Sequence, residues 1–401
     1  MFKHYILFAG MILVFCSCSS PKQTNKNVGS NNISTDTLTA ADMLFLSPEK
    51  QLQYYQSAEQ ILRTNKVESG KKKHRLINAS REFPDFSFVY KDTARSINDF
   101  MTATNVVGLI IIRNDSILLE KYREGIGVKS KWNNFSVAKS VTSLLFGAAL
   151  QDGAIKSLDQ KVTELITELK GSAYDSVTLQ NLLQMSSGVA WIDDPKNPNS
   201  DLVKMGKMEN ENGWDGVVNY LKQLKRAAPA GKRFNYNTVE TGLAGIVLIR
   251  ATGKSLSAYL SDKIWKPFGM HDDANWVKSR STDRENAGCC ISATLRDYAL
   301  LGLFAMHNGR GINNQQILPI NWMKESTTSA KSYKGYGYYW WLRPGGRYFA
   351  SGAFGQQVEI DPSQNTVIAV QSYWPTAFSD YYIDYLDGFI DAMMKNLKQI
   401  P

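Results

Sequence analysis

The chain has 401 residues, a formal net charge of +9, 43% hydrophobic residues and 21% charged residues. This balance excludes a disordered chain, a coiled coil and a polytopic membrane protein, and it predicts a globular protein. A nucleic-acid-binding face needs basic residues interleaved with aromatic ones, and only the short run 71–75 is strongly basic, so we expect no nucleic-acid partner.

The first twenty residues have the pattern of an export signal. The apolar run 5–15 follows Lys3, is too short to span a bilayer and fits the core of a secretory signal peptide. The segment Cys16-Ser-Cys18 that follows resembles the end of a bacterial lipoprotein signal, with Cys18 as the lipidated residue. We therefore predict a signal peptide over 1–20 and an exported, periplasmic lipoprotein that meets the membrane only through Cys18. The alternative is an ordinary signal peptide with incidental cysteines.

The next segment connects this signal to the main domain. Residues 21–40 are polar and predict a flexible tether. Ser47-Pro48 indicates the start of a short helix that ends near Leu62. We place the tether and this helical segment at 21–82 and a single domain at 83–399.

The main domain has strand patterns near both ends and helix patterns between them. Residues 106–122 and 357–372 each predict a β-hairpin. The middle, 137–329, reads as mostly helical, and an amphipathic helix is predicted over 381–397. This order predicts an α+β fold, in which one antiparallel sheet is flanked by helices, with an inserted helical lobe and a cleft at their junction.

The segment around Ser136 has the clearest chemical pattern. Ser136 and Lys139 lie in the first turn of a predicted apolar helix, and residues three apart share one helix face. A buried lysine loses charge because desolvation lowers its pKa, and the neutral amine can then take the serine proton. The competing interpretation is that Ser136 only caps the helix and that Lys139 extends to solvent. The same spacing at Ser47 and Ser69 lies in polar contexts without such a helix.

Two later segments complete a constellation with Ser136-x-x-Lys139. The second is Tyr236-Asn-Thr238, and the third is Ala350-Ser-Gly-Ala353. In this order and at these separations, the three motifs resemble those of penicillin-recognising serine enzymes. The resemblance is greatest to the class C β-lactamase-like serine hydrolases, in the branch of esterases and the 6-aminohexanoate-dimer hydrolase. Further segments that fit the same family are 178–188, 265–270, 292–297 and 337–341.

The resemblance implies a β-lactamase/DD-peptidase-like fold and a role for each matched residue. Ser136 is the nucleophile that forms an acyl-enzyme, and Lys139 assists its deprotonation. Tyr236 is a second general base that passes a proton to the leaving group, with its phenol pKa expected to be lowered by the neighbouring lysine. The backbone N–H groups of Ser136 and Ala353 form the oxyanion hole, typically worth about 3 kcal/mol per donor. Which of Lys139 and Tyr236 acts as the base stays open, and Tyr236 is alternatively a core aromatic.

Two departures from the family pattern bear on the substrate. Thr238 stands where the lactamases have asparagine, and Ala350 stands where many relatives have a lysine or histidine. A lysine there binds a substrate carboxylate; Arg343 or Arg347 is a geometric substitute. We therefore expect a small-molecule ester or amide substrate. The alternatives are a non-catalytic module that binds cell-wall peptides and a true β-lactamase or DD-peptidase.

Other chemistries have little support in the sequence. Cys289 and Cys290 are adjacent, and because neighbouring cysteines rarely bridge each other, we expect no disulfide framework. The four histidines do not pair at metal-ligand spacing, and the sequence predicts no metal and no cofactor. A Ser-His-Asp mechanism is disfavoured because His271 and His307 read as loop residues and Gly-x-Ser-x-Gly is missing.

Overall fold

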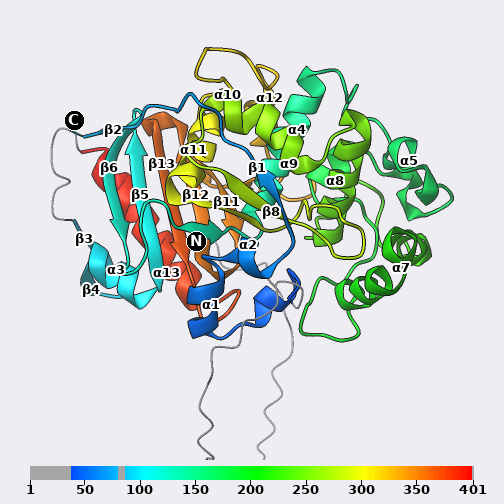
Figure 1. The fold of residues 1–401 in the computed structure, drawn as a ribbon, viewed down its shortest axis with the longest axis horizontal. Coiled ribbons are helices and arrows are strands. Elements are labelled where there is room, and N and C mark those ends of the chain that lie inside the picture. The colour runs from blue at the N-terminus through cyan, green and yellow to red at the C-terminus, as the bar shows by residue number, and fades with distance from the viewer. Residues whose placement is uncertain (1–37, 80–85, 400–401) are drawn as a thin grey trace, which may run out of the picture. The chain divides into compact units, whose positions relative to one another are not determined.

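The computed structural model describes residues 38–79 and 86–399, and these belong to one compact unit (Figure 1). The predicted signal peptide, with Cys16 and Cys18, and most of the predicted tether lie outside the described residues. Within the two described ranges, no helix combines the length and the hydropathy that a membrane span requires.

The main sheet has seven strands, and it joins the two predicted hairpins side by side. All neighbouring strands are antiparallel except the edge pair β6 and β2, which is parallel. The first hairpin meets the second where Ile110 lies opposite Ala369. In sheet order the strands are β10 (Trp341–Leu342), β11 (Tyr348–Gly352), β12 (Gln356–Asp361), β13 (Thr366–Ser372), β5 (Val106–Arg113), β6 (Ser116–Tyr122) and β2 (Ile77–Asn78).

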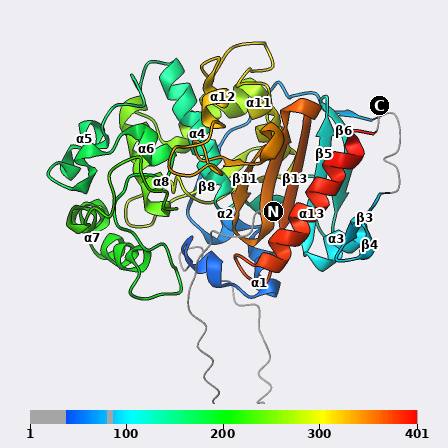
Figure 2. The same ribbon diagram turned by 180° about the vertical axis from the view of Figure 1, so that it is seen from behind.

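Helices cover both faces of this sheet, which explains why its central strands are buried along their length. Side chains alternate between faces along a strand, so Ile110 packs in one apolar cluster and Ile111 in the other. Helix α11 (Leu295–Met306) belongs to the first cluster, while α13 (Asp380–Leu397) and α3 (Ile97–Ala103) belong to the second. Figure 1 shows α11 on the near face, and Figure 2 shows α13 on the opposite face. The predicted α+β class is confirmed.

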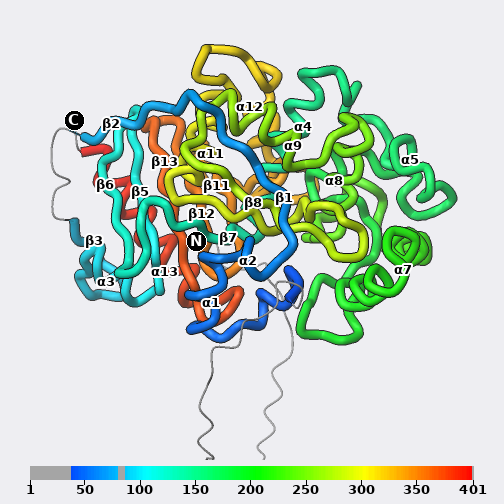
Figure 3. The backbone as a smooth tube through the Cα atoms, viewed as in Figure 1, coloured from blue at the N-terminus to red at the C-terminus, as the bar shows by residue number. Residues whose placement is uncertain are grey.

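A second, four-stranded sheet leads directly into the serine motif. Its order is β1 (Thr64–Val67), β8 (Ala274–Val277), β9 (Ile291–Thr294) and β7 (Lys131–Asn133). Strand β1 precedes residue 83, and Tyr55 packs against the rings of Trp132 and Phe135 at centroid distances of 5.7 and 5.0 Å. The predicted domain boundary at 83 is therefore too late, because residues classed as tether and helical segment contribute a strand and core side chains. Figure 3 traces this early segment alongside β8.

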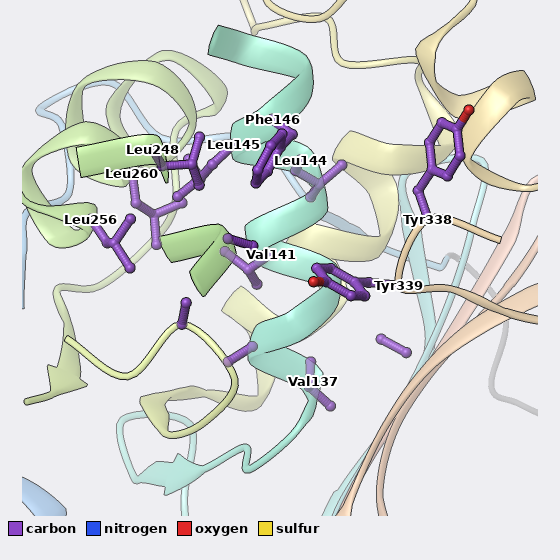
Figure 4. Close-up of a cluster of buried hydrophobic side chains, with 14 of the residues drawn as sticks. Val137, Val141, Leu144, Leu145, Phe146, Leu248, Leu256, Leu260, Tyr338 and Tyr339 are labelled. Carbon is purple, nitrogen blue, oxygen red and sulfur yellow. The ribbon is translucent and has the colours of Figure 1, made fainter. Parts of the chain in front are cut away.

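The inserted lobe is helical, as predicted, and α4 (Val137–Gln151) runs through its core. Residues 137–149 of α4 are all buried, and Leu145 lies beside Leu248 and Leu260 in the apolar cluster (Figure 4). A separate hairpin pairs β3 (Ser87–Tyr90) with β4 (Thr93–Ser96). The remaining α-helices are α1 (Pro48–Tyr54), α2 (Ala58–Ile61), α5 (Val162–Leu165), α6 (Leu179–Leu183), α7 (Asp201–Gln223), α8 (Thr238–Thr252), α9 (Leu256–Leu260), α10 (Lys266–Phe268) and α12 (Trp322–Ser326).

Candidate active site

Ser136 stands between β7 and α4, held by a tightly fixed turn. Asn134 is clamped to Ile291, because its backbone N–H donates to the Ile291 carbonyl at 3.0 Å and its Oδ1 accepts from the Ile291 N–H at 2.9 Å. Phe135 adopts φ +47°, a left-handed conformation that is strained for an aromatic residue. Ser136 precedes the first residue of α4, and its side chain makes no capping hydrogen bond. The capping interpretation is therefore excluded, and the partly exposed hydroxyl is available for chemistry.

Lys139 meets Ser136 within the first turn of α4. Its Nζ lies 3.0 Å from Ser136 Oγ and donates to the Gly288 carbonyl at 2.8 Å. Lys139 is only 2% exposed, so it does not extend to solvent. Burial lowers the pKa of the amine from 10.5 to about 8, although the negative charge of Asp193 opposes this shift. The amine thus reaches its neutral form close to physiological pH, as a serine-activating base requires.

The loop that carries Gly288 is bonded to α4 and braced within itself. Thr142 Oγ1 donates to the Ala287 carbonyl at 2.8 Å, and the Gly288 N–H donates to Asn286 Oδ1 at 3.0 Å. The next two residues, Cys289 and Cys290, are joined by a disulfide. This corrects the expectation from sequence, which treated the adjacent pair as unbridged. The backbone at Cys290 has a left-handed φ of +80°.

Tyr236 completes the predicted trio. Lys139 Nζ lies 5.1 Å from the centroid of the Tyr236 ring, which stacks on Trp341 at 6.1 Å. Burial raises the pKa of the phenol, and the hydrogen bond with Ser136 only partly offsets this rise. The prediction that the neighbouring lysine lowers the Tyr236 pKa is wrong, because desolvation of the phenolate dominates. Tyr236 is therefore a protonated phenol that faces the Ser136 hydroxyl.

The end of β11 approaches Ser136 closely enough to complete an oxyanion hole. A methyl group built on Gly352 would lie 2.3 Å from the Asn134 carbonyl oxygen and 3.2 Å from the Ser136 nitrogen. Only glycine allows this approach. The next residue, Ala353, is the predicted second oxyanion donor. Neither its N–H nor that of Ser136 donates to another group among the hydrogen bonds of the described residues outside helices and strands.

Asp193 belongs to the site and was not predicted from the sequence. Its Oδ2 accepts from the backbone N–H of Thr238 at 2.9 Å. Thr238 in turn packs against Gly288, the residue whose carbonyl holds Lys139. The Asp193 charge raises the pKa of both Lys139 and Tyr236. The available signal was the acidic pair Asp193-Asp194, which begins five positions after the family segment that ends at Gly188.

Neither candidate arginine replaces the missing lysine at Ala350. The Ala350 side chain is 2% exposed and lines a small void with Val137, Ser140 and apolar neighbours. Arg343 binds the buried Glu359 and Asp387, at 3.0 and 2.5 Å. Arg347 binds Asp391 at 2.6 Å. The proposed substitution by Arg343 or Arg347 is therefore wrong, because both guanidinium groups are held by carboxylates of β12 and α13.

Glu240 lies one helical turn after the tyrosine motif and is fully enclosed. It is 1% exposed, and neither carboxylate oxygen has a hydrogen-bond partner within normal distance. Burial raises its pKa from 4.5 to about 8, while Ser187 and Arg226 lower it in part. Glu240 is thus a buried carboxylic acid that is mostly uncharged at neutral pH.

Comparison with known proteins places this geometry in a family. A family model described as Beta-lactamase matches residues 93–386, most of the chain. The chain belongs to the beta-lactamase family. The resemblance deduced from the three motifs is thereby confirmed, and so is the β-lactamase/DD-peptidase-like fold.

Individual relatives agree with the family match. The 6-aminohexanoate-dimer hydrolase of Paenarthrobacter ureafaciens is 27% identical over 290 residues, which cover 66% of this chain and 72% of that protein. A solved structure from Bacillus anthracis, named provisionally for the same activity, has a TM-score of 0.78 at 23% identity and covers 94% of this chain and 100% of that one. A family VIII carboxylesterase has a TM-score of 0.57 at 15% identity, with 74% and 95% covered. The family and the hydrolase relative support the assignment as a serine hydrolase.

Proposed function

We propose that this protein hydrolyses an ester or a small amide through an acyl-enzyme on Ser136. The observation that carries the proposal is the 3.0 Å approach of Ser136 Oγ to the Nζ of a lysine that is 2% exposed. A buried amine of this kind has no evident structural purpose, since desolvating a charge costs stability unless the charge is paired. Beside a partly exposed serine hydroxyl, it can serve as a base.

The geometry supports a division of roles between Lys139 and Tyr236. Neutral Lys139 takes the Ser136 proton as Oγ attacks the substrate carbonyl carbon, and the resulting oxyanion accepts hydrogen bonds from the N–H groups of Ser136 and Ala353. Tyr236, kept protonated by its raised pKa, donates a proton to the leaving alcohol or amine and recovers one from Lys139. Water then attacks the acyl-enzyme, Ser136 regains its proton, and the free acid leaves.

The features of the third motif favour esters and small amides over β-lactams. Ala350 supplies no cation for a substrate carboxylate, and neither nearby arginine is free to do so. The curated relative is named for hydrolysis of 6-aminohexanoate dimer, a small amide, and one structural neighbour is a carboxylesterase. We expect little or no turnover of nitrocefin by this chain.

Turnover of p-nitrophenyl butyrate tests the proposal against a non-catalytic binding module. We expect release of p-nitrophenol by the intact protein and background rates in Ser136→Ala and Lys139→Ala. A wild-type rate equal to that of Ser136→Ala, under conditions where a control esterase is active, would favour the binding module. The Asp194→Asn variant is a suitable control, because the Asp194 side chain accepts a local hydrogen bond from the Lys196 N–H, at 2.9 Å, and none from a residue of the site in the described part of the chain.

A further inference from the structure

The disulfide between Cys289 and Cys290 takes no part in the proposed reaction, yet it lies between two groups that hold the site. The residue before it is Gly288, whose carbonyl accepts a hydrogen bond from Lys139 Nζ at 2.8 Å. Its second residue, Cys290, donates its N–H to the carbonyl of Phe135 at 3.3 Å, and Phe135 directly precedes the proposed nucleophile. The bridged peptide is therefore bonded to the proposed base on one side and to the nucleophile turn on the other.

The Gly288 carbonyl sets the direction of the proposed base. A neutral amine has two N–H groups and one lone pair, and only the lone pair can take a proton. One N–H of Lys139 is fixed on the Gly288 carbonyl, while Ser136 Oγ lies 3.0 Å from the same nitrogen. A displacement of that carbonyl would turn the lone pair away from the hydroxyl, and a misplacement of about 1 Å can cost about 100-fold in rate.

The bridge constrains the local peptide and not the chain as a whole. A disulfide stabilises a protein mainly by closing a loop in the unfolded chain, and the gain grows with the size of the loop. Cys289 and Cys290 are adjacent, so almost no loop is closed. Cys290 also has a φ of +80°, a conformation that residues with a side chain rarely adopt and that persists only where neighbouring contacts hold it. Reduction would thus remove one constraint from this peptide and leave the remaining fold in place.

The two cysteines differ in exposure, which determines how a reductant reaches the bridge. Cys290 is fully buried and belongs to the same apolar cluster as Phe135, whereas Cys289 is partly exposed. Thiol–disulfide exchange begins with the attack of a thiolate on one of the two sulfur atoms. The Cys289 sulfur is the accessible one. Residues 38–401 contain no other cysteine, so no further thiol of this part of the chain competes for the pair.

We propose that the Cys289–Cys290 pair is a redox switch of the hydrolase. The oxidised pair holds the peptide that positions Lys139, and reduction of the pair lowers the activity. This inference rests on the proposed hydrolase function and adds a means of regulating it. The change at the switch is a bond between two sulfur atoms, and the element that it biases is the peptide between the Gly288 carbonyl and the Cys290 N–H.

The redox step requires a dithiol as the reductant. One thiolate of the dithiol attacks the Cys289 sulfur, the bond between the two cysteines breaks, and Cys290 leaves as a thiolate that takes up a proton. The second thiol of the reductant then displaces Cys289, which also becomes a thiol. Two electrons and two protons have passed to the protein, and the reductant is left as a cyclic disulfide.

The test compares the two redox states of one protein. The full chain carries Cys16→Ser and Cys18→Ser, so that Cys289 and Cys290 are its only cysteines. It is reduced with dithiothreitol and desalted without air, and intact mass after iodoacetamide treatment counts the thiols. We expect kcat/KM for p-nitrophenyl butyrate to fall by about 10- to 100-fold on reduction and to recover on reoxidation. Labelling of Ser136 by a fluorophosphonate should slow by a similar factor.

A variant without the bridge is the matched control. In the same background, Cys289→Ser/Cys290→Ser should have the low activity of the reduced protein, and dithiothreitol treatment should not change it. Equal rates in the oxidised and the fully reduced protein would overturn the inference while the proposed hydrolase function stands. So would a bridge that resists excess dithiothreitol in the folded protein, or a pair that no oxidant closes. Absence of turnover in both redox states is instead the failure of the proposed function.

Hydrogen–deuterium exchange tests the coupling without catalysis. The Ser136→Ala protein is compared in its oxidised and reduced states. We expect faster exchange on reduction in residues 286–294 and 133–139, with no change in α13. Identical exchange in these two segments would contradict the inference. Faster exchange across the whole domain would also contradict it, because the bridge would then be a general support of the fold.

Discussion

The acid limb of the pH–rate profile reports directly on Lys139. Lowering the pH protonates the amine, and only the neutral amine can accept the Ser136 proton. Because burial sets the pKa of Lys139 at about 8, kcat/KM should rise tenfold per pH unit below this value and level off above it.

The size of the effect on the neutral fraction of Lys139 follows from the shift in its pKa. At pH 7, about 10% of an amine with pKa 8 is neutral, compared with about 0.03% for the ordinary value of 10.5. Burial therefore increases the reactive fraction by about 300-fold, which corresponds to about 3 kcal/mol. Asp193 opposes the shift, so Asp193→Asn should move the limb to lower pH.

The assay is initial-rate hydrolysis of p-nitrophenyl butyrate from about pH 5 to about pH 9.5, with the Ser136→Ala rate subtracted at each pH. Lys139→Arg keeps a positive charge throughout this range and should remain inactive even at the highest pH. A limb centred near pH 4 to 5 would point to a carboxylate base and would refute the role of Lys139. A flat profile would refute it equally.

Three further predictions concern Tyr236, Gly352 and Glu240. Tyr236→Phe should lower kcat by about 10²- to 10⁴-fold on an anilide substrate and much less on a p-nitrophenyl ester, because nitrophenolate leaves without a proton. Equal losses of kcat on the two substrates would contradict the role of Tyr236 as a proton donor. Gly352→Ala should slow Ser136 acylation by about 10- to 100-fold, because the added methyl group would lie 2.3 Å from the Asn134 carbonyl oxygen. Gly242→Ala is the control, because a methyl group there meets open space and should leave the acylation rate unchanged. The pKa of Glu240 is raised from 4.5 to about 8, so its contribution to stability is complete below pH 4.5 and is lost as the pH rises to 8. In urea unfolding, the free energy of unfolding should therefore fall by up to about 1.4 kcal/mol per pH unit because of this group. The fall should be absent in Glu240→Gln.

The strands and helices with strong periodicity were predictable from the sequence. The hairpin at 106–122 appears as β5 and β6, and the final helix at 381–397 appears as α13. The first begins with a continuous apolar run of strand length, and the second has the apolar period of a helix. Residues 64–67 are too few to show such a pattern. They form strand β1 only by pairing with β8, which is distant in the sequence. The domain boundary was misplaced for this reason.

Sequence spacing alone predicted the contacts of the site only where they are local, and the family resemblance supplied those of Tyr236 and Ala353 with Ser136. Ser136 and Lys139 are three residues apart, so helix geometry alone brings them together. Asp193 reaches the site through a loop whose path depends on tertiary packing. Residue spacing in the sequence does not predict that path. The direction of the Tyr236 pKa was missed because desolvation depends on the surrounding fold, and the sequence does not specify how deeply the phenol is enclosed.

The central claim is that Ser136 is the nucleophile, activated by Lys139. The most direct measurement is intact mass after reaction with a fluorophosphonate, followed by peptide mapping. The account predicts a single adduct on Ser136, none in Ser136→Ala, and slow labelling in Lys139→Ala. An unlabelled wild-type protein beside a reactive control esterase, or an adduct on another residue, would contradict it.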